Sequence, residues 1–123
     1  MQRVLVLLGV VCVVVSAGAL AMAGADEEGE AKYNIKEIMK QAHKEKLLNK
    51  VMEGGASQED KSKLLDLYLS LLENTPKKGE EDSWHAKAGA VVIAAAKVAV
   101  GRGGAEAELK TATNCAECHK AHK

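Results

Sequence analysis

Residues 84–100 read WHAKAGAVVIAAAKVAV. The run is apolar almost all the way round a helical wheel and is rich in alanine, the strongest helix former. We therefore expect a central, closely packed helix over these residues. Ser83 or Asp82 can cap its start, and a glycine-rich turn at residues 101–104 ends it.

Two amphipathic segments precede this run. Residues 33–52 form the first predicted helix, and its inward face carries Ile35, Ile38, Met39 and Ala42, with His43 and Leu47 at the edge. Ser57 can cap the second helix, which Pro76 follows. Its apolar stripe comprises Leu64, Leu67, Tyr68, Leu71 and Leu72.

A fourth helix is predicted from Ala105 to the chain end, with Leu109, Ala112, Ala116 and His119 along one face. No alternating strand pattern occurs anywhere in the sequence. Four helices with short connections favour an all-α fold, an antiparallel up-down-up-down four-helix bundle.

The last predicted helix contains the motif Cys115-Ala-Glu-Cys118-His119. The spacing C-x-x-C-H is typical of the attachment site for c-type haem. Two cysteines three residues apart lie one helical turn apart, so both thiols can reach one edge of a porphyrin. His119 can then give the iron its proximal imidazole. We expect one covalently bound haem c (iron) per chain.

Two other kinds of site can contain the same cysteine pair. A redox dithiol usually opens a helix after a strand, and no strand is predicted here. A zinc ion could be bound by Cys115, Cys118, His119 and His122, which would make the chain a zinc-stabilised helical interaction module. Adjacent Cys118 and His119 point in different directions on a helix, which is poor for one tetrahedral ion.

The beginning of the chain resembles a secretory signal. Arg3 precedes an apolar run at residues 4–15, and small residues with Ala-x-Ala patterns follow. Residues 1–24 are therefore predicted to be a cleaved signal peptide, with an uncleaved anchor as the alternative. Residues 25–123 would be one exported domain without a stable membrane span, in the periplasm or an equivalent compartment. Cys12 would be lost with the signal, which leaves both remaining cysteines in the motif.

Charge and residue types exclude several function classes. The chain carries 17 Lys and Arg against 17 Asp and Glu, without the dense basic stripe that nucleic-acid binding needs. His85, His122 and the carboxylates form no recognisable nucleophile–base set, so we do not expect an enzyme.

The chain resembles the class II c-type cytochromes, that is, the cytochrome c-prime family and its low-spin relatives. The resemblance rests on the motif near the C-terminus, the Lys-rich tail after it, Trp84 at the head of the third helix and a Met in the first. It implies single-electron transfer with redox partner proteins, and a possible homodimer formed through the first two helices.

The resemblance also bears on the sixth coordination position of the haem iron. In the low-spin relatives a Met of the first helix binds there, whereas the high-spin members have an apolar residue and bind small gases. Met39, near the centre of the inward face, matches the low-spin ligand position. His43 is the alternative distal ligand, and an open, gas-binding iron is the alternative function. Either residue could instead be an ordinary helix residue, Met39 as a core gap-filler.

The chain departs from the family in two respects. Ile35 stands where the family often has an Arg, four residues before the distal position. The segment between Trp84 and Cys115 is also short for the family. The sequence is therefore interpreted as a divergent member with the same bundle.

Overall fold

A computed structural model describes residues 30–123, and within this range the chain forms helices joined by turns, with no strand. The all-α expectation is confirmed. The predicted signal peptide and Cys12 lie outside the described residues. Within residues 30–123, none of the helices combines the length and apolar character that a membrane crossing demands.

The first helical segment starts at a capping box. The Asn34 side chain accepts a hydrogen bond from the Glu37 N–H at 2.9 Å, and the Glu37 carboxylate accepts one from the Asn34 N–H at 2.9 Å. Helix α1 (Ile35–Ile38) continues directly into a π-helix, η1 (Met39–Lys44). This segment buries Ile38 and Ala42 on its inward face, as expected.

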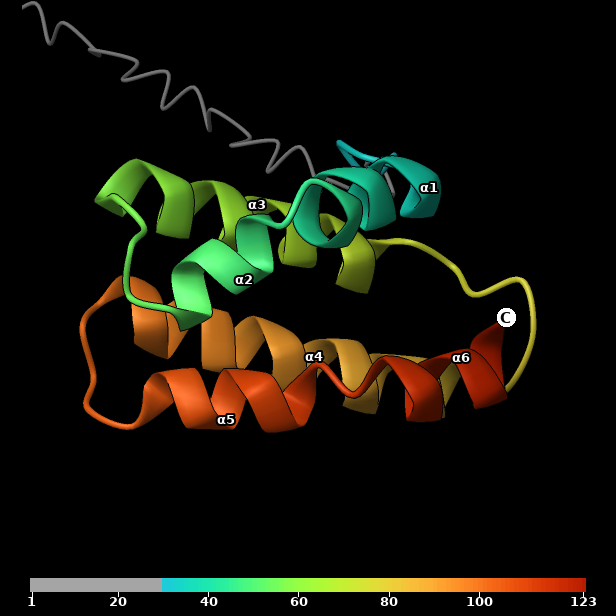
Figure 1. Cartoon of the computed structure of the whole chain (residues 1–123). Helices are drawn as coiled ribbons and strands as arrows, with labels where there is room; N and C mark the ends of the chain where they lie inside the picture. The colour runs from blue at the N-terminus through green and yellow to red at the C-terminus, as the bar shows by residue number, and fades with distance from the viewer. Residues whose placement is uncertain (1–29) are drawn as a thin grey trace, which may run out of the picture.

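The expectation of one continuous helix over residues 33–52 is wrong. The π-helical turn ends at Glu45, and Lys46 has a left-handed backbone with φ of 63°. Helix α2 (Leu47–Met52) then starts in a new direction (Figure 1). The change of direction buries Leu48 and Val51.

We predict that Lys46→Gly raises the free energy of unfolding by about 1 kcal/mol. A left-handed backbone is costly for a residue with a Cβ, and Lys46 is exposed, so glycine loses no buried contact there. Chemical denaturation measures the change. Lys44→Gly, two residues earlier in the helical segment, is the matched control and should instead lower stability by about 1 kcal/mol. If both substitutions changed the free energy of unfolding by the same amount, the left-handed backbone at Lys46 would carry no strain.

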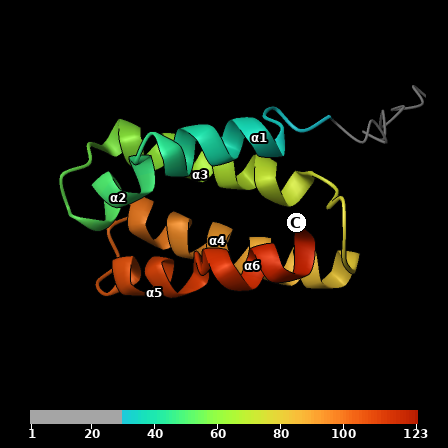
Figure 2. The same ribbon diagram turned by 45° about the vertical axis from the view of Figure 1, so that its right-hand side comes forward.

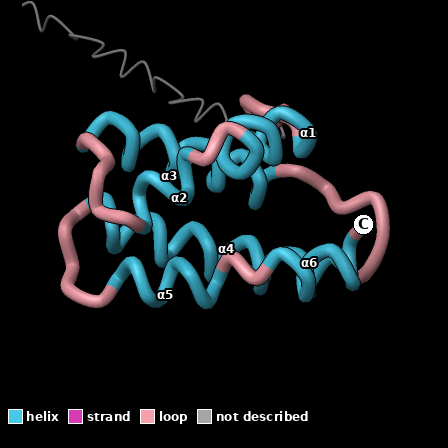
Figure 3. Tube along the Cα trace, viewed as in Figure 1, coloured by secondary structure: helices cyan, strands magenta, loops and turns pink. Residues whose placement is uncertain are grey.

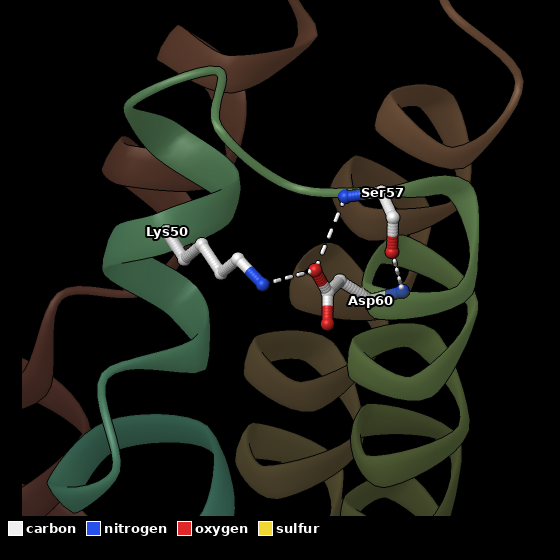
Figure 4. Close-up of polar contacts among 3 residues, drawn as sticks. All are labelled: Lys50, Ser57 and Asp60. Atoms are coloured by element: carbon white, nitrogen blue, oxygen red, sulfur yellow. Dashed lines mark hydrogen bonds and ion pairs between the residues drawn. The ribbon is translucent and has the colours of Figure 1, made fainter.

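Helix α3 (Gln58–Glu73) begins at Ser57, as expected. Ser57 Oγ accepts a hydrogen bond from the Asp60 N–H, and the Asp60 carboxylate accepts one from the Ser57 N–H, both at 3.1 Å. Lys50 Nζ of α2 lies 2.6 Å from the same carboxylate (Figure 4). The Lys50 contact lowers the pKa of Asp60, and it links α2 to the start of α3.

Helix α4 (Glu81–Ala99) starts earlier than the sequence suggested. Its N-cap is Glu80, whose side chain makes no capping hydrogen bond, so the expected cap at Ser83 or Asp82 is wrong. Glu81 and Asp82 instead lie in the first turn, where negative charge favours the helix dipole. Burial is also less complete than expected, because Ile93 is 59% exposed.

The last predicted helix is two helices, α5 (Ala105–Ala112) and α6 (Cys115–His122). The chain leaves the helix at Thr113, and Asn114 caps α6 by accepting a hydrogen bond from the Glu117 N–H at 3.2 Å. The predicted single face is therefore interrupted. Leu109 is buried, whereas Ala116 and His119 are exposed. Cys115 becomes the first residue of a helix.

The helices form two groups that face each other. In two views, α4, α5 and α6 lie on one side and α1, α2 and α3 on the other (Figures 1 and 2). Helix α3 packs on α4, α4 on α5, and α2 on both α3 and α5. Short loops connect most of these helices, as the tube in Figure 3 shows. The core between the groups includes Ile38, Leu64, Leu67, Val98 and Leu109.

His122 holds the end of α6 in position. Although it lies next to the last residue of the sequence, only 8% of the residue is exposed. Its Nδ1 lies 2.9 Å from the Lys78 carbonyl oxygen, and its Nε2 lies 3.2 Å from Ser83 Oγ. Its ring meets the Trp84 ring edge-on at 5.4 Å. Gly79 allows this approach, because a Cβ there would lie 2.5 Å from the Ala121 carbonyl oxygen.

We predict that His122→Ala lowers the free energy of unfolding by about 2–3 kcal/mol. The substitution removes two hydrogen bonds and one edge-on aromatic contact, each of which contributes about 1 kcal/mol. Thermal and chemical denaturation measure the loss. His85→Ala is the control, because the His85 side chain is 51% exposed and should contribute less than about 0.5 kcal/mol. A loss no larger than that of His85→Ala would show that His122 does not anchor α6.

Candidate cofactor site

One cavity lies where the two groups of helices meet next to α6. Its volume is about 60 Å³. Side chains from η1, α3, α4, the α5–α6 turn and α6 form its walls. The lining residues are Met39, His43, Tyr68, Leu71, Trp84, Lys87, Ala88, Val91, Ala112, Thr113, Asn114, Cys115, Cys118 and His119. All five residues singled out from the sequence as haem ligands or attachment points therefore line the same cavity.

The C-terminal wall carries two free thiols and an imidazole. Cys115 is exposed at the first turn of α6, and Cys118 is half-buried one turn later. Burial raises the pKa of the Cys118 thiol, and the nearby Lys87 ammonium opposes that effect. His119 is exposed to solvent but also lines the cavity. This wall can offer two sulfur nucleophiles and one nitrogen ligand.

The opposite wall is formed by the π-helix. Met39 and His43 are its first and fifth residues, and both are partly buried. Short π-helical segments occur frequently at functional sites. The His43 ring packs 6.0 Å from the Tyr68 ring, centre to centre. Burial and the nearby charge of His119 lower the pKa of His43, which favours the neutral imidazole that binds metals.

Two buried donors also line this cavity. Tyr68 is 1% exposed and Trp84 is 4% exposed, yet neither Tyr68 Oη nor Trp84 Nε1 has a hydrogen-bond partner within residues 30–123. Burial raises the pKa of Tyr68, so its phenol keeps its proton. The sequence pattern places Tyr68 in an apolar stripe and Trp84 at the head of a helix. Their polar tips were the overlooked signal, since a buried Tyr or Trp usually finds a partner.

The donor set fits a tethered haem in its chemistry. Thiols and one imidazole lie on one wall, a thioether and a second imidazole lie on the other, and Leu71, Ala88 and Val91 supply apolar surface. Size is a separate condition. A cavity of about 60 Å³ is far smaller than a macrocycle. The side chains that line it must move apart to admit a macrocycle.

The zinc interpretation fits less well. Within residues 30–123, no group of three or more His, Cys, Asp or Glu side chains is arranged to hold a metal ion. Both ring nitrogens of His122 lie within hydrogen-bond distance of Lys78 and Ser83. His122 is therefore not directed toward Cys115, Cys118 and His119, and the expected four-residue zinc set is not assembled.

Comparison with known protein families, curated protein sequences and solved structures finds no match for this chain. The chemistry of the cavity residues is therefore the guide to function.

Proposed function

We propose that this chain is an exported c-type cytochrome of the class II kind that transfers single electrons through one covalently attached haem. One observation carries the proposal. Cys115, Cys118 and His119 line the same cavity as Met39 and His43, although the two sets lie at opposite ends of the described sequence. A haem attachment motif thus faces, across an apolar space, side chains of the two types that complete haem iron in electron carriers.

Each residue has a defined role in this proposal. When bound, the haem supplies an iron that gains and loses one electron. The thiols of Cys115 and Cys118 tether its edge through thioether bonds, and the imidazole of His119 holds the proximal position. Met39 is the favoured distal ligand, with His43 as the alternative. Leu71, Ala88 and Val91 would supply apolar surface against the ring.

The proposed architecture is an antiparallel four-helix bundle. Its helices would be α1 to α2 taken together, α3, α4, and α5 with α6 taken together. The contacts of α3 with α4, of α4 with α5, and of α2 with both α3 and α5 support this arrangement. Redox proteins of the same extracytoplasmic compartment would be its partners, and no catalytic activity of its own is proposed.

Optical spectra of the exported protein, recorded oxidised and reduced, test this function. Low-spin haem bands support the electron carrier. High-spin bands, with ready binding of carbon monoxide by the reduced protein, indicate a five-coordinate gas-binding protein instead. The absence of any haem band, in protein from cells able to attach haem, would overturn both.

A further inference from the structure

Three side chains that line the cavity carry hydrogen-bond donors that a bound group could use. Tyr68 Oη and Trp84 Nε1 are buried donors without partners in the described chain. Lys87 adds an ammonium group, and its side chain is 32% exposed. Trp84 and Lys87 are three residues apart on α4, so they share a face of that helix.

No aspartate or glutamate is among the residues that line the cavity. The nearest recorded carboxylate partner of Lys87 is Glu117, at 3.7 Å, which is longer than a hydrogen bond. A buried polar group without a partner is destabilising, so two such groups in one cavity call for an acceptor on whatever binds there.

We propose that Tyr68, Trp84 and Lys87 form a carboxylate-binding subsite that receives a propionate of the bound haem. This inference rests on the proposed function, since haem is the group that brings the carboxylate. The phenol and indole would donate hydrogen bonds to the carboxylate oxygens, and the ammonium would compensate the negative charge. A carboxylate that leaves water requires such partners, because burying an unpaired charge is very costly.

Binding of haemin and of haemin dimethyl ester to the ligand-free full chain tests the subsite. The ester keeps the macrocycle but removes both carboxylates. The wild-type chain should prefer haemin by about tenfold or more, the contribution expected from hydrogen bonds to a charged group. Tyr68→Phe, Trp84→Phe and Lys87→Gln should each reduce that preference. Tyr33→Phe is the matched control, because Tyr33 does not line the cavity.

The two proposals fail in different ways. If the wild type and all three variants show the same ratio of affinities for haemin and its dimethyl ester, the subsite is overturned. Binding of haemin itself would still support the cytochrome. If the chain binds neither compound and the exported protein carries no haem, the proposed function itself is overturned, and the subsite with it.

A second measurement compares the denaturation midpoints of the haem-loaded protein and of the ligand-free chain. Tyr68→Phe should lower the denaturation midpoint of the loaded protein relative to Tyr33→Phe. In the ligand-free chain the same substitution should leave the midpoint unchanged or raise it, because it removes an unpaired hydroxyl. Equal shifts in both forms would overturn the subsite.

Discussion

Replacing Cys115 and Cys118 together with alanine should leave the exported protein with no covalently attached haem. The two thiols are the only cysteine sulfurs in the described chain, and both line the cavity. Intact-mass analysis after denaturation measures the result: the wild type should carry the mass of one haem, and the double variant should have the mass of the bare polypeptide. Each single variant can still form one thioether bond, so its loss should be partial.

Ala116→Ser is the control for this experiment. Ala116 lies between the two cysteines and is exposed, so serine there should leave attachment intact. A double variant that still carried haem through denaturation would show that the attachment point lies elsewhere. A wild-type mass equal to that of the bare polypeptide would overturn the assignment altogether.

Much of the helical content followed from local sequence patterns. The faces that bury Ile38, Leu64 and Leu67 were visible because a 3.6-residue period depends only on nearby residues. The cap at Ser57 was visible for the same reason. The face that carries Ile38 also placed Met39 toward the cavity.

The two helix breaks were harder to predict. Lys46 adopts a left-handed conformation within a stretch of lysine and glutamate, where no glycine or proline marks a turn. The break at Thr113 did have a signal: Asn114 and Glu117 have the spacing of a helix cap and its third helical residue.

Burial of His122, Tyr68 and Trp84 depended on tertiary contacts. His122 is buried because the loop at Lys78 and Gly79 crosses it. Residues 78 and 122 are far apart in the sequence, and no local pattern connects them. The unpaired donors of Tyr68 and Trp84 likewise become evident only once α3 and α4 form the walls of one cavity.

Met39→Ala should convert the haem-loaded protein from low spin toward high spin and admit carbon monoxide to the reduced iron. Met39 is partly buried on the cavity wall opposite α6, and alanine there has no atom able to reach a metal. The thioether is a soft ligand that favours ferrous iron, so its loss should also lower the reduction potential. The expected drop is on the order of 0.1 V, within the range of about 0.8 V that axial ligands span.

Two further variants assign these effects to a ligand rather than to packing. Met52→Ala removes a partly buried methionine of α2 that does not line the cavity, so it should lower stability without changing spin state. His43→Ala should also leave the iron low-spin, although His43 lines the same wall and lowering of its pKa favours the neutral imidazole. If His43→Ala alone produced the high-spin form, the two axial ligands would be His43 and His119, and Met39 would be a packing residue. If the wild type were already high-spin, neither residue would bind the iron and the site would be open to gases.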